Sequence, residues 1–174
     1  MADNPNAFAA LIDLGPGSST DHHIGPPSPE RGGRTYGGQF MAQAVMAAYR
    51  TVADDRFVNS FHGLFLRPGD VDQPTEWLVE RVRDGRSFSN RTVIGSQGGK
   101  EVFRAMLSLH VPEDGFEFQP TMDVDPGRLP EPDEVTTTYV EFCDAHPDLE
   151  PGDWFGEDRP MDIRYIDAPS PGSG

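Results

Sequence analysis

The sequence predicts an α+β domain in which a curved antiparallel sheet wraps around a central helix. Three observations lead to this fold class: an apolar helical segment over residues 37–52, a period-two segment over 57–66, and three further strand-like segments joined by tight turns. A sheet of this size must cover an apolar face, and the 37–52 segment is the long apolar element available for that purpose. We therefore expect this helix to lie inside the curve of the sheet.

The segment 37–52 carries the strongest helix pattern in the chain. It is rich in Ala, Met and Gln, which favour helices, and it is apolar around most of its circumference. Gln39, Gln43 and Arg50 form its polar stripe. A helix of this kind is usually buried and closely approached by its neighbours. A shorter docking helix is expected over residues 5–14.

Four strands are predicted after the helix. The first covers 57–66, where successive residues alternate between two faces, and it ends at the segment Arg67-Pro68-Gly69-Asp70. The turn signals Asp84-Gly85 and Gly98-Gly99 join the next three strands into an antiparallel meander. Those three strands are expected at 76–83, 87–97 and 101–111, and a brief strand is expected at 22–24 inside the loop 15–34.

Charge divides the chain into two regions. The net charge is −15, which disfavours nucleic-acid binding because a phosphate backbone would be repelled. Residues 1–111 hold 11 basic and 12 acidic side chains, whereas 112–174 hold 3 basic and 17 acidic ones. No apolar segment reaches the ~20 residues that span a bilayer, and the N-terminus lacks a signal-peptide pattern. We therefore expect no membrane span and a cytoplasmic location.

The pattern predicts one domain over 1–111 and an acidic, Pro/Gly-rich linker over 112–160 with a short helix at 135–145. Residues 161–166 alternate like a strand, with no partner strand after them. Two interpretations are open: this is an ordinary edge strand, or residues 161–174 begin a second unit whose remainder is missing.

Five segments carry a family resemblance. They are Arg-Thr-Tyr-Gly-Gly-Gln at 34–39 with Ala-Gln-Ala at 42–44, Ser-Phe-His-Gly-Leu-Phe-Leu-Arg-Pro-Gly-Asp at 60–70, Val-Glu-Arg-Val-Arg-Asp-Gly-Arg-Ser-Phe at 79–88, Gly-Phe-Glu at 115–117 and Asp-Arg-Pro at 158–160. In this order and spacing the chain resembles the acyl-CoA thioesterase II family from about residue 34 to residue 166.

The resemblance implies half of a double hotdog. Members of that family carry two hotdog folds, each a helix wrapped by an antiparallel sheet, and they hydrolyse acyl-CoA to a free fatty acid and coenzyme A. This chain resembles the first hotdog, the linker and the first strand of the second. The family's catalytic Asp, Thr and Gln lie in the second hotdog, and no position of this chain matches them. We therefore expect no catalytic residue here and no activity from the chain alone.

The beginning of the central helix is the first candidate for substrate contact. A helix N-terminus offers free N–H groups and about half a positive charge, which can polarise a thioester carbonyl. Gly37 and Gly38 would let a carbonyl or phosphate come close, and Gln39 would orient a water molecule. Paired glycines before a buried helix also serve close backbone packing, so both interpretations are open.

His62, Arg67 and Arg86 complete the expected substrate-binding set. His62 is either a hydrogen-bonded core residue or a contact at the acyl channel or domain interface. Arg67 and Arg86, together with Arg83 and Arg91, are candidates for the phosphates of coenzyme A, and pairing with the acidic tail is the equal alternative.

Other chemistry finds little support in the sequence. The Gly-x-Ser-x-Gly pattern of a serine nucleophile is absent, and the acidic surroundings of Cys143 disfavour a thiolate. No metal or cofactor is expected. Two functions compete: an acyl-CoA thioesterase that works with a second hotdog domain, and a hotdog dimer that binds acyl-CoA or a partner without catalysis. In either case an open sheet edge and helix flank predict self-association or pairing with a second hotdog.

Overall fold

The computed structural model describes residues 5–28, 33–121, 127, 129–135, 141 and 164. The chain divides into two compact units, one of Asn4–Asp114 and one of Met1–Asp3 with Gly115–Gly174. In the second unit the described residues include a short 3-10 helix, η2 (Pro132–Glu134). The helix expected at 135–145 and the strand expected at 161–166 lie almost wholly outside the described residues.

The described residues of the first unit contain one antiparallel sheet of six strands, which are β1 (Gly15–Pro16), β2 (His22–Gly25), β3 (Phe57–Phe65), β4 (Thr75–Asp84), β5 (Phe88–Gln97) and β6 (Lys100–His110). Their order in the sheet is β1-β2-β4-β5-β6-β3. The tight turn at Gly98 and Gly99, with φ of 54° and 74°, joins β5 to β6 as its sequence predicts. The tight turn expected at Asp84-Gly85 is longer than predicted, because three residues, 85–87, connect β4 to β5.

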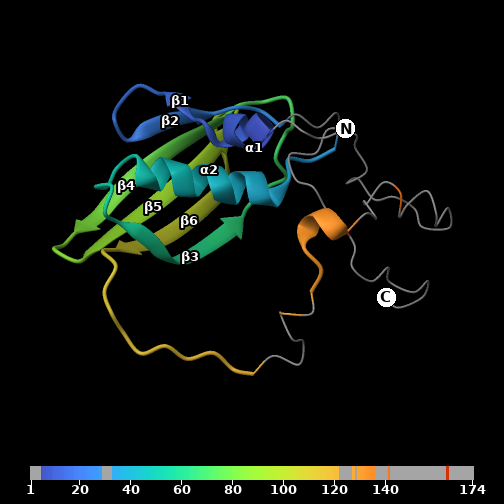
Figure 1. Cartoon of the computed structure of the whole chain (residues 1–174). Coiled ribbons are helices and arrows are strands. Elements are labelled where there is room, and N and C mark those ends of the chain that lie inside the picture. The colour runs from blue at the N-terminus through green and yellow to red at the C-terminus, as the bar shows by residue number, and fades with distance from the viewer. Residues whose placement is uncertain are drawn as a thin grey trace. The chain divides into compact units, whose positions relative to one another are not determined.

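Helix α2 (Gly37–Tyr49) lies across the inner face of this sheet, as predicted (Figure 1). Its buried Phe40 meets Trp77 of β4 edge-on, with ring centroids 6.1 Å apart. Gly95 of β5 makes room for the indole, because a Cβ there would lie 2.5 Å from Trp77 Cζ3. The core also includes buried residues of α2, β5 and β6, among them Ala44, Ala47, Ala48, Val93, Phe103, Leu107 and Leu109.

The polar stripe of α2 holds the N-terminal segment rather than facing solvent. Gln43 is fully buried, and its Nε2 donates to Leu11 O at 2.8 Å. Arg50 donates to Leu14 O and, through Nη2, to Asp13 Oδ1 at 3.0 Å. Helix α1 (Pro5–Ile12) therefore docks beside α2 because backbone carbonyls at and after its C-terminal end find donors there.

Because of His23 in β2, the folding stability of the first unit is expected to depend on pH. Its side chain is buried, and its Nε2 has no hydrogen-bond partner among the described residues. Burial, reinforced by the nearby Arg50 charge, lowers the pKa of His23 below its usual 6.5. The unfolded chain thus takes up a proton near pH 6.5 that the folded chain resists, so stability is present above that pH and is lost as the pH falls.

We expect the free energy of unfolding to drop by about 1 kcal/mol between pH 7.5 and pH 5.5. Urea denaturation at the two pH values measures this loss. His23→Leu should remove most of it, whereas His62→Gln, which alters an exposed histidine, should leave it unchanged. An equal loss in the His23→Leu variant would contradict the assignment.

Candidate functional site

The beginning of α2 is enclosed by aromatic rings. A Cβ on Gly37 would lie 3.0 Å from Phe65 Cε1, and one on Gly38 would lie 2.4 Å from Tyr36 Cε1. Tyr36 holds the N-cap position and does not cap the helix through its side chain. Both glycines therefore lie close to aromatic side chains, and close backbone packing, the other interpretation of the sequence, stays a prediction. Their role in the approach of a carbonyl stays a prediction.

Gln39 is turned toward the protein interior. It is 4% exposed, and its Nε2 donates to Pro26 O at 3.1 Å. Its amide nitrogen is thus engaged by the loop after β2. Orientation of a water molecule by Gln39 stays a prediction.

A short stretch of extended chain lies beside the beginning of α2. Thr35 N donates to Gly69 O at 3.1 Å, and Arg34 and Asp70 form an isolated antiparallel bridge. Arg67, two residues before Gly69, is exposed, and its Nη1 donates to Glu101 O at 2.5 Å. The segment that ends β3 is thereby held next to the helix N-terminus.

Two features near this N-terminus were missed by sequence reasoning. Thr35 Oγ1 is buried without a hydrogen-bond partner among the described residues, and such an atom is costly unless water or a ligand satisfies it. The Phe65 ring packs 4.9 Å from Phe103, yet 57% of Phe65 remains exposed. A phenylalanine at the end of an alternating strand was the available signal for Phe65.

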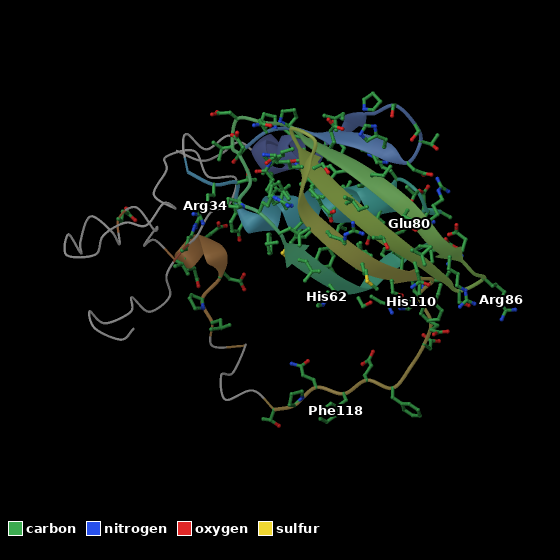
Figure 2. The ribbon with its side chains drawn as sticks, turned by 180° about the vertical axis from the view of Figure 1, so that it is seen from behind. Arg34, His62, Glu80, Arg86, His110 and Phe118 are labelled. Atoms are coloured by element: carbon green, nitrogen blue, oxygen red, sulfur yellow. The ribbon has the colours of Figure 1, made fainter. Side chains whose placement is uncertain are left out.

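The interpretation of His62 as a core residue is wrong. His62 is exposed, on the face of the sheet turned away from α2 (Figure 2). The register between β3 and β6 shifts between Val58 and Ser60, so Val58 and Phe61 both pack against the core. A β-bulge changes the phase of alternation, which the residue pattern alone does not reveal. The second interpretation, a contact at a channel or interface, stays a prediction.

The expected arginine group is divided. Arg91 is 1% exposed, so it cannot reach a phosphate from solvent, and its assignment to phosphate binding is wrong. Its guanidinium donates to Asp84 Oδ1 at 2.6 Å and to Thr51 O at 3.0 Å. The hydrogen bond from Arg91 lowers the pKa of Asp84, with help from Ser89. Arg91 therefore fixes the hairpin to the end of α2.

Arg86 lies at the turn between β4 and β5, at the opposite end of the domain from Arg34 and the beginning of α2 (Figure 2). Gly37, Gly38 and Gln39 thus lie together at the beginning of α2, and Arg67 lies nearby in the segment that follows β3. His62 and Arg86 lie apart from that group. The six candidates do not form one site.

No helix of the described residues is long and apolar enough to cross a membrane. Across the same described stretches, no three His, Cys, Asp or Glu side chains are arranged to hold a metal ion.

A helix enclosed by a curved antiparallel sheet, with its N-terminus beside the end of an edge strand, defines a hotdog domain. Residues 26–110 match the family described as acyl-CoA thioesterase N-terminal domain. The acyl-CoA thioesterase 2 of Haemophilus influenzae is 35% identical over 144 residues, which are 80% of this chain and 49% of that relative.

Two solved structures of thioesterases are similar to this chain in sequence and in fold. The acyl-CoA thioesterase II TesB2 from Mycobacterium marinum shares 35% identity at a TM-score of 0.61, covering 74% of this chain and 48% of its own. The tesB protein from Mycobacterium avium subs paratuberculosis shares 32% at a TM-score of 0.64, covering 76% and 50%. The first unit of this chain therefore belongs to the family of acyl-CoA thioesterase N-terminal domains. The chain spans about half the length of these relatives.

Proposed function

We propose that this chain is the N-terminal half of an acyl-CoA thioesterase that hydrolyses fatty acyl-CoA to free fatty acid and coenzyme A. It works with a second hotdog domain, which supplies the catalytic groups, in the cytoplasm and in fatty-acid metabolism. The match of residues 26–110 to the thioesterase N-terminal domain carries this proposal. Residues 161–174 would then begin the second hotdog, after a linker at 112–160.

The open edge of β3 supports a partner on this side. Among the residues that the structure describes, β3 is the last strand of the sheet and is nine residues long, whereas β1 at the other edge has two. A long unpaired edge presents a row of backbone N–H and C=O groups that readily accept another strand. We place the second hotdog, or a second copy of this chain, along β3.

Exposed apolar side chains accompany this edge. Phe57 and Phe65 lie at the two ends of β3 and are 55% and 57% exposed, and Leu66 after it is 45% exposed. Met41 of α2 is 41% exposed. Such residues next to an open strand edge are typical of an interface that the isolated domain leaves uncovered.

In catalysis the beginning of α2 would receive the thioester carbonyl. The free N–H groups and partial positive charge of a helix N-terminus stabilise the negative charge that develops on the carbonyl oxygen. Thr35 Oγ1, buried and without a partner among the described residues, is a further hydrogen-bonding group in this neighbourhood. The second domain would activate the attacking water molecule.

The test is hydrolysis by the chain alone and by the chain joined to the part of the Haemophilus influenzae relative that it does not cover. Release of the free thiol of coenzyme A is followed over a series of acyl lengths. We expect no turnover above the blank from the chain alone and clear turnover from the joined protein. Inactivity of the joined protein on every acyl-CoA would contradict the proposal.

Phe65→Glu should weaken association with the second hotdog by at least tenfold, because it places a charge at the proposed interface. Analytical ultracentrifugation of the two separate domains measures this effect. Met106→Glu is the matched control, since Met106 is 64% exposed on β6, one strand inside the edge strand β3. Equal weakening by the two variants would place the interface elsewhere.

A second candidate function is a hotdog dimer that binds acyl-CoA without hydrolysing it. The hydrogen bond from Gln39 Nε2 to Pro26 O favours it, because it engages the side chain that was expected to orient a water molecule. Binding of a non-hydrolysable acyl-CoA analogue by the chain alone, with no turnover in the joined protein, would select this function.

A further inference from the structure

A serine, a histidine and a glutamate meet where the hairpin of β1 and β2 joins β4, at the edge of the sheet opposite β3 (Figure 1). Ser18 Oγ lies 2.9 Å from His22 Nδ1. His22 Nε2, on the other side of the same ring, lies 3.6 Å from Glu76 Oε2. A hydroxyl next to one imidazole nitrogen, with a carboxylate next to the other, is the arrangement that activates serine nucleophiles, and it is recognised by geometry rather than by a sequence motif.

The backbone of Ser18 determines which ring nitrogen of His22 carries the proton. Ser18 N donates to His22 Nδ1 at 3.0 Å, and a backbone N–H can only donate. In the neutral ring Nδ1 is therefore the nitrogen without a proton, and Nε2 carries the N–H that faces Glu76. The Ser18 hydroxyl thus donates to Nδ1, which is the position that a general base must hold.

The hairpin holds the imidazole in this orientation. A Cβ on Gly17 would lie 2.6 Å from His22 Cγ, so the ring occupies space that glycine leaves free. Gly17 N donates to His22 O at 2.9 Å, and His22 N donates to Ser19 O at 3.1 Å. The His22 side chain is 20% exposed, whereas Ser18 is exposed, so the base is sheltered while the hydroxyl can be reached.

β4 fixes both the hairpin and the carboxylate. Arg81 donates from Nε and Nη2 to Asp21 Oδ1 at 2.9 and 2.7 Å, which engages the carboxylate beside His22 in the sequence. Glu76 is the cross-strand partner of Ile24, two residues after His22, so the Glu76 and His22 side chains point to the same face of the sheet. The register of β2 and β4 therefore sets the contact between Glu76 and the ring.

We propose that Ser18 is a nucleophile that cleaves small, uncharged carboxylic esters, with His22 as its general base and Glu76 as a positioning residue. Ser18 Oγ attacks the ester carbonyl carbon while its proton passes to His22 Nδ1. The bond from the carbonyl carbon to the alcohol oxygen breaks, the alcohol leaves with that proton, and the acyl group stays on Ser18. Water then attacks the acyl group, its proton passes through His22 to Ser18 Oγ, and the acid is released.

The surroundings of the hydroxyl indicate the substrate class. Ser18 lies in the exposed loop of the hairpin, so a small ester reaches it without a deep pocket. The Glu76 side chain is 58% exposed, and together with the net charge of −15 it repels a ligand that carries several phosphates. The site is therefore suited to an uncharged ester rather than to acyl-CoA. It does not depend on the proposed thioesterase function, which uses the beginning of α2.

Incubation of the whole chain with p-nitrophenyl acetate tests the proposal. Absorbance follows the release of p-nitrophenol, and mass spectrometry of peptides from the quenched reaction locates the acetyl group. We expect acetylation of Ser18, at a rate that falls at least about 100-fold in His22→Gln. Ser18→Ala keeps the backbone N–H that holds the ring, and it should abolish reaction at this hairpin. Ser19→Ala and His62→Gln change an exposed serine in the same loop and an exposed histidine elsewhere, and should react like the wild type.

Glu76→Gln removes the charge and keeps the size of the side chain. It should lower the rate of acetylation about 10-fold and leave the ester concentration at half-maximal rate unchanged, because Glu76 acts through His22 and does not contact the ester. Long-range ¹H–¹⁵N spectra of the wild type should show the neutral His22 ring protonated at Nε2. Circular dichroism confirms that each variant is folded. Equal reaction of the wild type, Ser18→Ala and His22→Gln, or a neutral ring protonated at Nδ1, would overturn the proposal.

Discussion

Arg91→Ala is expected to lower the free energy of unfolding of the first unit by about 3–5 kcal/mol. The Arg91 side chain is fully buried, and each of its N–H groups has an acceptor. Nε donates to Thr51 Oγ1 at 2.8 Å, and Nη1 donates to Arg83 O and Asn90 O at 3.1 and 2.9 Å. Nη2 donates to Thr51 O and Asp84 Oδ1 at 3.0 and 2.6 Å.

The expected loss comes mainly from the buried acceptors and the cavity. The Asp84 side chain is 54% exposed and regains water when Arg91 is removed, so the ion pair itself contributes little. Arg91→Lys should cost less than Arg91→Ala but still about 2 kcal/mol, since an ammonium cannot reach all five acceptors. Urea denaturation at pH 7.5 measures the two changes. Arg86→Ala, in the exposed turn nearby, should change stability by less than about 0.5 kcal/mol. A similar small change for Arg91→Ala would refute the structural role.

Gln43→Leu is expected to lower the free energy of unfolding by about 2–4 kcal/mol. Gln43 Oε1 accepts from Trp77 Nε1 at 3.0 Å, and its Nε2 donates to Leu11 O at 2.8 Å. Leucine is close in volume, so the substitution isolates these hydrogen bonds. Trp77 Nε1 and Leu11 O would both lose their partner inside the core, and α1 would lose one of its anchors to α2, while Arg50 keeps the hydrogen bonds to Leu14 O and Asp13.

Gln39→Leu is the matched control on the same stripe. Pro26 O accepts from both Gln39 and Gln43, each at 3.1 Å, so it keeps a partner when Gln39 is replaced. We expect a loss below about 1 kcal/mol for Gln39→Leu. Thermal denaturation together with tryptophan fluorescence compares the two variants, since Trp77 reports the Gln43 site. Equal losses of stability in the two variants would show that the buried hydrogen bonds of Gln43 contribute no more than the hydrogen bond of Gln39.

Local pattern predicted most of the elements because local forces determine them. The apolar segment at 37–52 became α2, and Gly98 and Gly99 formed the turn that their freedom at positive φ allows. The position of β3 beside β6 was not predicted, because a tight turn fixes only the strands that it joins. β1 was also missed, since two residues in a Gly/Pro-rich loop carry no periodic signal.

The candidate site was harder to predict than the fold. Residue type suggests that an arginine binds phosphate or that a glutamine faces solvent. Whether the side chain is buried decides between such a role and a structural one. Arg91 and Gln43 are polar residues that the core uses, and the sequence gives no sign of the acceptors that surround them.

The pairing of a second hotdog along β3 is tested most directly by amide hydrogen exchange of residues 57–65. Exchange is measured in the chain alone and with the missing part of the Haemophilus influenzae relative added. We predict that alternate amides of β3 exchange at least about tenfold more slowly in the complex, because only the outward N–H groups gain new acceptors. Unchanged exchange along β3 in a complex that hydrolyses acyl-CoA would contradict the account.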